Sequence, residues 1–131
     1  RERIDTPGFG PWSQKAGVWQ VVPSVDVMQR MLTLRVHLDD CFRDNGPLRV
    51  LPGTHLHGFL DGQIPCWRSR IEEVTCEVGA GGVLAMRPLL LHASSPAEVP
   101  QHRRVIHIEY ACDQLPGGLN WHEHVASATR K

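Results

Sequence analysis

The chain has 131 residues, and its 14 Lys and Arg balance its 14 Asp and Glu. This length is typical of one domain, and the balanced charge excludes a strong electrostatic attraction to nucleic acid or to an anionic membrane. We therefore expect a small molecule as the partner. No apolar run approaches the ~20 residues that are needed to cross a bilayer, and the first residues show no signal-peptide pattern.

The four cysteines lie far apart and form no Cys-x-x-Cys pair; they are Cys41, Cys66, Cys76 and Cys112. Such spacing fits neither a zinc ribbon nor a dense disulfide scaffold, so we expect reduced thiols and a cytoplasmic protein. The chain begins without Met, inside a charged phrase. We interpret it as a fragment of a longer protein, with an N-terminal part that precedes Arg1.

The first 30 residues predict a loop, a short strand and a short helix. Residues 1–16 are rich in Gly, Pro and polar groups, which favours a loop. Residues 17–22 are predicted as a short strand. Ser24 can cap a brief helix that runs to about Arg30.

From Met31 onward, apolar and polar residues alternate with the period of two that a strand requires. The apolar positions are Leu32, Leu34, Val36 and Leu38, and the polar positions are Thr33, Arg35, His37 and Asp39. The Asn45-Gly46 pair marks a tight turn into a second strand over 48–51, which Pro52-Gly53 ends. We predict that these two strands are antiparallel neighbours.

The rest of the chain predicts further short strands. Residues 56–73 form a looser insertion that is partly helical, and residues 74–78 and 82–86 are strands around a glycine-rich turn. Residues 103–111 alternate again, with Ile106, Ile108 and Tyr110 on an apolar face that must pack on another element while the polar face looks into a cavity. Many short strands with little helix predict a mainly β fold, a sandwich or a barrel.

The most informative phrase runs from Pro88 to Pro96, where an apolar run ends in His92, and Arg103 follows on a later strand. An imidazole and a guanidinium are suited to hold a cation and an organic dicarboxylate side by side. Arg104 is a rival to Arg103. The period of two places Arg104 on the apolar face with Ile106, which leaves Arg103 to face the pocket.

The phrase over 38–55, with its Leu-Asp-Asp strand, Asn-Gly turn and Pro-Gly-Thr-His ending, resembles the phytanoyl-CoA dioxygenase (PhyH-like) family. The later phrases around His92 and over 103–110 fit this family in the same order. The resemblance implies a double-stranded β-helix, also called a jelly roll or cupin-like fold, that lacks its N-terminal helical part. It divides the chain into a lead-in over 1–30, a jelly-roll core over 31–112 and a C-terminal tail over 113–131.

The resemblance also implies the chemistry, which is an iron(II)- and 2-oxoglutarate-dependent oxidation of a small organic substrate with O2. By the family's motifs, His92 is the distal iron ligand, and Arg103, Ser94 and Arg35 bind the cosubstrate. His37 and His107 are expected to line the pocket for the substrate. The family's H-x-D pair of iron ligands is expected upstream of Arg1, so we expect the chain alone to be inactive.

Two other functions stay open. The first alternative is a non-catalytic jelly-roll module that binds a ligand without metal, and the second is a cupin-type metal enzyme that uses His37, Asp39 and His92. The second alternative rests on the His37-Leu38-Asp39 phrase, which is itself an H-x-D motif on a strand. More ordinary roles are a core histidine for His92 and a surface charge for Arg103.

Overall fold

The computed structural model describes residues 3–123 and 125. The chain forms two compact units, of which the first combines residues 1–24 with 113–131 and the second comprises residues 25–112. The tail predicted over 113–131 lies partly outside the described residues. No helix among the described residues is long and apolar enough to cross a membrane.

The first unit contains a β-hairpin of β1 (Trp12–Lys15) and β2 (Val18–Val21). The two strands are joined by Ala16 and Gly17, whose φ values of 48° and 78° are those of a tight two-residue hairpin turn. The prediction of a loop over 1–16 is therefore wrong for residues 12–15. The polar residues of β1 obscured the strand, because β1 is largely exposed and carries no apolar alternation.

The second unit contains two three-stranded antiparallel sheets, with the strand orders β6-β3-β8 and β5-β4-β7. The strands are β3 (Leu32–His37), β4 (Leu48–Val50), β5 (Val74–Cys76), β6 (Val83–Met86), β7 (His92–Ser94) and β8 (Val105–Tyr110). The helical elements are α1 (Val25–Arg30), α2 (Ile64–Arg68) and two short 3-10 turns, η1 (Arg43–Asn45) and η2 (Thr54–His57). The prediction of a mainly β fold is confirmed.

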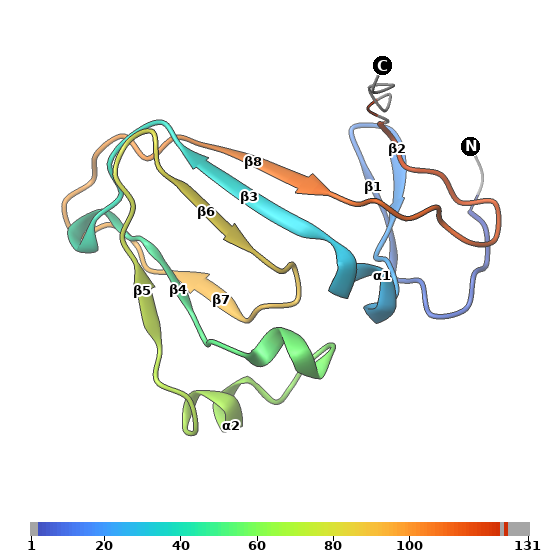
Figure 1. Ribbon diagram of the computed structural model, residues 1–131, viewed down its shortest axis with the longest axis horizontal. Helices are drawn as coiled ribbons and strands as arrows, with labels where there is room; N and C mark the ends of the chain where they lie inside the picture. The colour runs from blue at the N-terminus through green and yellow to red at the C-terminus, as the bar shows by residue number, and fades with distance from the viewer. Residues whose placement is uncertain (1–2, 124, 126–131) are drawn as a thin grey trace, which may run out of the picture. The chain divides into compact units, whose positions relative to one another are not determined.

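The two sheets face each other, as Figure 1 shows. The prediction that the strands over 31–38 and 48–51 pair is wrong, because β3 and β4 belong to different sheets. The η1 turn and Gly46 carry the chain from one sheet to the other instead of closing a hairpin. In the same way β5 and β6 lie in different sheets. Strands that alternate between two facing sheets are the arrangement a jelly roll requires.

The register shows which side chains face the space between the sheets. Residues directly opposite each other on antiparallel strands point to the same face. Arg35 lies opposite Leu84 of β6 and His107 of β8, and Leu34 lies opposite Ala85 and Ile108. The inward positions of this sheet are Thr33, Arg35, His37, Leu84, Met86, Val105, His107 and Glu109. The polar side of β3 therefore faces inward.

The core of this unit joins the two sheets. Leu48, Val50 and Met86 are buried together, and Cys76, Leu84 and Leu90 pack against them. The opposite, outward face of the β6-β3-β8 sheet is apolar but open, since Ile106 is 49% exposed and Val83 is 53% exposed. The predicted apolar face of β8 therefore has no full cover within the described residues.

Candidate metal and cosubstrate site

His92 begins β7 and points into the space between the sheets. It lies opposite the buried Val50, and Ser94 lies opposite the buried Leu48, so both side chains share the inward face of β4. The His92 Nδ1 atom is 2.7 Å from the Leu90 carbonyl oxygen. A histidine that donates from one ring nitrogen to a carbonyl keeps the lone pair of the other nitrogen available for a metal. His92 is thus oriented as a metal ligand would be.

Thr54 anchors the segment that leads to His92. Its side chain is fully buried, and its Oγ1 atom donates to the Leu51 carbonyl at 2.8 Å and accepts from the Leu91 N–H at 3.0 Å. The Leu51 N–H also donates to the Leu91 carbonyl at 3.0 Å. Sequence reasoning missed this role, although Thr54 lies in the Pro-Gly-Thr-His phrase that it singled out.

Arg103 is held by the backbone of the Asn45-Gly46 turn. Its Nη1 atom donates to the Asn45 carbonyl at 3.1 Å and to the Gly46 carbonyl. Gly46 has a φ of 64°, and a Cβ atom there would lie 2.4 Å from the Ser95 carbonyl and 2.5 Å from Arg103 Nη1. Only glycine fits this position, because the turn needs both the left-handed backbone and the space.

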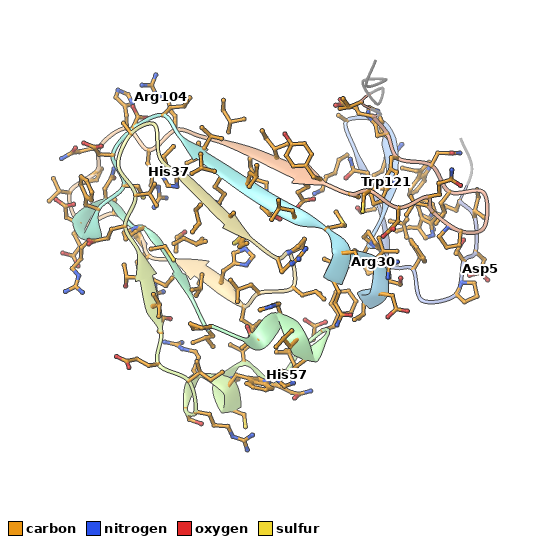
Figure 2. The ribbon with its side chains drawn as sticks, in the orientation of Figure 1. Asp5, Arg30, His37, His57, Arg104 and Trp121 are labelled. Atoms are coloured by element: carbon orange, nitrogen blue, oxygen red, sulfur yellow. The ribbon has the colours of Figure 1, made fainter. Side chains whose placement is uncertain are left out.

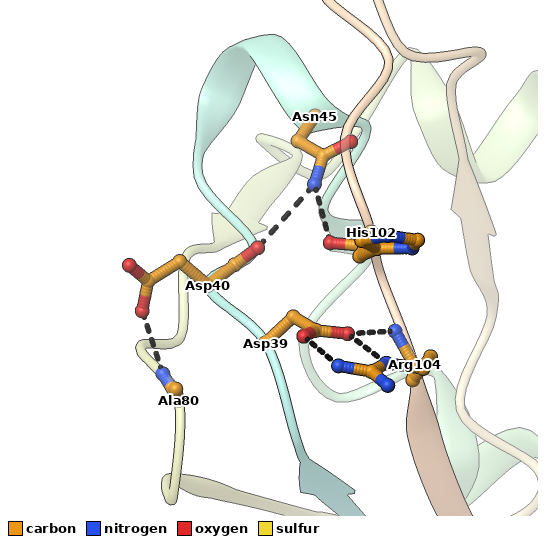
Figure 3. A network of polar contacts seen from close by, with 6 residues as sticks. All are labelled: Asp39, Asp40, Asn45, Ala80, His102 and Arg104. Carbon is orange, nitrogen blue, oxygen red and sulfur yellow. Dashed lines mark hydrogen bonds and ion pairs between the residues drawn. The ribbon is translucent and has the colours of Figure 1, made fainter.

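A polar network fixes the segment before β8 to the end of β3, as Figure 3 shows. The buried Asn45 side chain donates to the carbonyls of Asp40 and His102, at 3.3 Å each, and accepts from the Gln101 N–H at 3.2 Å. Asp40 accepts from the Ala80 N–H at 2.7 Å. These bonds span up to 57 residues of sequence and determine where Arg103 lies.

Asp39 forms a two-point ion pair with Arg104 (Figure 3). Arg104 donates from Nε to Oδ2 at 2.9 Å and from Nη2 to Oδ1 at 2.7 Å, and its backbone N–H adds a third bond at 2.8 Å. The hydrogen bonds from the Arg104 side chain and backbone lower the pKa of Asp39 well below its usual range. His37 and Arg104 lie at the same end of the sheet in Figure 2.

The structure does not support a metal site made of His37, Asp39 and His92. Both Asp39 oxygens are engaged by Arg104, and no group of three His, Cys, Asp or Glu side chains that could hold a metal exists among the described residues. The alternative of a cupin-type enzyme with these ligands therefore has no support from the described residues. The spacing of an H-x-D motif could not show that β3 ends at His37 or that Asp39 pairs with Arg104.

β3 carries several buried polar atoms that have no hydrogen-bond partner within the described part of the chain. Thr33 is 1% exposed and His37 is 2% exposed. The Thr33 hydroxyl, the Arg35 Nε atom and both ring nitrogens of His37 have no partner within the described part of the chain. Burial lowers the pKa of His37, and the nearby Arg35 charge lowers it further. Native proteins rarely leave such atoms unsatisfied, so this row fits a polar ligand.

The other predicted positions contribute less to this region. His107 faces inward opposite Arg35 and lies 3.6 Å from Glu109. His57 stacks on Trp67, with ring centroids 4.5 Å apart, near α2 in Figure 2. Two hollows of about 400 and 750 Å³ are lined by neither His92 nor Arg103.

Comparisons with known proteins show the family of this chain and proteins of similar structure. A family model described as phytanoyl-CoA dioxygenase (PhyH) matches residues 3–105. The solved structure of AviO1 from Streptomyces viridochromogenes Tue57 is 32% identical with a TM-score of 0.58, covering 66% of this chain and 39% of AviO1. The structure of EvdMO1 is 30% identical with a TM-score of 0.59, covering 81% of this chain and 24% of EvdMO1. No curated protein matches the chain.

EctD from S. alaskensis is similar in two structures. The structure with bound Fe is 25% identical with a TM-score of 0.56, covering 63% of this chain and 32% of EctD. The structure with 2-oxoglutarate and 5-hydroxyectoine is 26% identical with a TM-score of 0.57, covering 66% of this chain and 33% of EctD. The chain thus spans 24% to 39% of the length of these proteins.

Proposed function

Because this chain belongs to the phytanoyl-CoA dioxygenase family, whose members depend on Fe(II) and 2-oxoglutarate, we propose that it is the cosubstrate-binding part of such a dioxygenase, one that hydroxylates a small organic substrate. The observation that carries the proposal is the order of three groups along one inward face. Arg103 contacts Gly46, Ser94 lies opposite Leu48, and His92 lies opposite Val50.

Ser94 and His92 lie opposite Leu48 and Val50 of β4, and Arg103 contacts Gly46, two residues before β4 begins. A cosubstrate held between the Arg103 and His92 side chains would thus run along the inward face of β4. Arg103 then pairs with the distal carboxylate of the cosubstrate, because its planar fork makes two charge-assisted hydrogen bonds and keeps its proton. Ser94 donates its hydroxyl hydrogen between the two ends, and Arg35 faces the cosubstrate from β3.

The donor set fits 2-oxoglutarate and supplies part of an iron site. His92 provides one imidazole, and the described residues contain no further pair that completes a set of three ligands with it. Among the described residues, His92 is the one side chain that we assign to iron. When bound, iron and 2-oxoglutarate supply the oxidative step, in which O2 and the keto acid are consumed, succinate and CO2 are released, and a substrate C–H bond becomes C–OH. His107 faces the substrate.

The test compares the whole protein with this chain, each supplied with Fe(II), O2 and 2-oxoglutarate, by measuring succinate. We expect succinate from the whole protein and none from the chain, because His92 is the one iron ligand that we assign among the described residues. Arg103→Gln is expected to raise the KM for 2-oxoglutarate about 10- to 100-fold, since a charged hydrogen bond contributes about 1.5 to 3 kcal/mol.

The matched control for this test is Arg104→Gln, which removes the neighbouring guanidinium that pairs with Asp39. Its KM is expected to stay within about threefold of the unchanged protein, because Arg104 does not face the cosubstrate. An equal effect of the two substitutions would contradict the role proposed for Arg103. Succinate from the chain alone would contradict the iron site described above.

A non-catalytic jelly-roll binding module is the second candidate, favoured by the lack of three metal-binding side chains among the residues described. The two candidates differ in the whole protein. An H-x-D or H-x-E phrase elsewhere in its sequence, together with iron-dependent 2-oxoglutarate consumption, decides for the dioxygenase. Cosubstrate binding that does not depend on iron decides for the module.

A further inference from the structure

The buried row on β3 requires a hydrogen-bonding occupant. His37 is 2% exposed and neither of its ring nitrogens has a partner among the described residues. A buried polar atom without a hydrogen bond costs about 1 to 3 kcal/mol, so folded proteins nearly always satisfy such atoms. The metal and cosubstrate groups proposed above do not involve His37. The side chains around His37 therefore indicate which kind of ligand it binds.

The register places His37 beside Arg35 and at the end of the sheet that is next to Arg103. His37 lies opposite Val105 of β8, and the Leu38 N–H donates to the Arg104 carbonyl, so the segment that carries Arg103 continues alongside the end of β3. Arg35 precedes His37 by two residues on β3 and also faces inward. Burial raises the pKa of the Cys41 thiol, while the nearby charges of Arg103 and Arg35 oppose this rise. Both guanidinium groups thus lie close to one buried thiol.

An anion is the ligand that suits this arrangement. Arg35 acts on a buried imidazole that has no hydrogen bond, and Arg103 and Arg35 both act on the nearby Cys41 thiol. Among the paired residues of β3, β6 and β8, the one inward carboxylate is Glu109, which lies opposite Thr33 at the other end of β3. Because burial keeps His37 neutral at neutral pH, its ring offers one N–H donor to a carboxylate.

The order of the inward positions identifies the carboxylate of the cosubstrate that His37 contacts. Arg103 marks the end of the site at Gly46, and His92 marks the end at Val50. His37 is the inward residue of β3 nearest to the Arg103 end. This differs from the expectation that His37 lines the substrate pocket.

We propose that His37 donates a hydrogen bond to the distal carboxylate of 2-oxoglutarate, beside Arg103, and so makes the site prefer dicarboxylate over monocarboxylate keto acids. This inference rests on the proposed function, because it assumes that 2-oxoglutarate binds between His92 and Arg103. It adds a binding residue on β3, which neighbours β8 in one sheet and faces the sheet that carries Ser94.

The experiment measures binding and stability in the whole protein, under anaerobic conditions with Fe(II), by calorimetric titration and thermal unfolding. The ligands are 2-oxoglutarate and 2-oxobutyrate, which lacks the distal carboxylate. His37→Leu is expected to weaken 2-oxoglutarate binding about tenfold, the effect of one hydrogen bond to a charged group, and to leave 2-oxobutyrate binding within about twofold. His37→Gln keeps an N–H donor and is expected to recover 2-oxoglutarate affinity to within about threefold of the unchanged protein.

Stability separates this role from a purely structural one. Without ligand, His37→Leu is expected to unfold at a temperature equal to or higher than that of the unchanged protein, because it removes two buried polar atoms that have no partner. A structural histidine would instead lower that temperature when replaced. His57→Ala, which removes a histidine that lies against Trp67 and not on this face, is the control and is expected to leave the preference between the two keto acids unchanged.

The outcomes distinguish this inference from the proposed function. If the unchanged protein binds neither keto acid, the proposed function is wrong and the inference falls with it. If the unchanged protein binds 2-oxoglutarate and His37→Leu binds it equally well, or loses both ligands to the same extent, only the role of His37 is overturned. If His37→Leu does not fold, the His37→Gln titration decides: loss of the dicarboxylate preference in a variant that retains a donor overturns the inference.

Discussion

Thr54 illustrates how one buried hydroxyl determines the position of a functional residue. Its Oγ1 atom joins the Leu51 carbonyl to the Leu91 N–H, one residue before His92. The sequence predicted a turn at this point from Pro52-Gly53. It did not predict the contact between Thr54 and Leu91, because Leu91 lies 37 residues away and local sequence patterns carry no information about such a distant contact.

Replacing Thr54 by Val is expected to lower the free energy of unfolding by about 1 to 3 kcal/mol, because the buried Leu91 N–H loses its acceptor. Urea unfolding at neutral pH is the measurement. Thr54→Ser keeps the hydroxyl and is the matched control, with a smaller expected loss of about 1 kcal/mol from the missing methyl group. Equal losses in the two variants would show that the methyl group, and not the hydroxyl, stabilises this segment.

The Asp39–Arg104 pair is expected to make stability depend on pH in the acid range. Arg104 holds the pKa of folded Asp39 below its usual value, so unfolded Asp39 binds a proton first as the pH falls. The stabilisation is present above about pH 4 and is lost as the pH falls toward the lower pKa of the folded state.

Unfolding free energies measured at a series of pH values from neutral to strongly acidic test this dependence. Asp39→Asn and Arg104→Gln are each expected to flatten the acid part of the curve, and the double variant is expected to be no flatter than either single variant. An unchanged slope in Asp39→Asn would mean that other carboxylates cause the acid sensitivity.

At the scale of elements, alternation located the strands but not their partners. Leu34 and Arg35 fall on opposite faces of β3 as the period of two predicted, and β4, β6 and β8 lie within a few residues of their expected ranges. Pairing failed because a turn signal such as Asn45-Gly46 fixes a local bend and not the sheet to which the next strand belongs. The polar network that orients Arg103 depends on that bend.

Gly46→Ala is expected to disturb this bend more than Gly53→Ala, although both glycines have a positive φ. At Gly53 nothing lies within 4 Å of an added Cβ, so the expected cost is the backbone strain of about 1 to 2 kcal/mol. At Gly46 the added carbon meets Ser95 and Arg103 as well. Urea unfolding is expected to show a larger loss for Gly46→Ala, accompanied by weaker 2-oxoglutarate binding; equal losses would contradict the close packing.

At the scale of the whole molecule, the outward face of the β6-β3-β8 sheet is an exposed apolar surface. The large apolar residues that it exposes are Leu32, Val83, Ile106 and Tyr110. The strand pattern predicted that this face needs a cover. The partner that covers this face was not predictable, because an exposed apolar face indicates that a partner is needed but does not indicate which partner it is.

Ile106→Thr is expected to reduce the fluorescence of an apolar dye bound to this chain, because it interrupts the middle of that face. Val99→Thr is the control, since Val99 is similarly exposed, at 52%, but lies in a loop. Dye titration of the two variants measures the difference. Equal fluorescence would indicate that the dye binds elsewhere.

The two main-chain carbonyls that hold Arg103 have a consequence for how an acid would be captured. A flexible side chain normally loses rotamer freedom when it closes on a ligand, and this loss weakens association. Arg103 has already given up that freedom when the protein folds, since the Asn45 and Gly46 carbonyls fix its guanidinium. The Asn45-Gly46 turn, whose two carbonyls carry no net charge, would thus fix the position of Arg103 before an acid binds. The selectivity of the site for an acid would then depend on the shape of this turn.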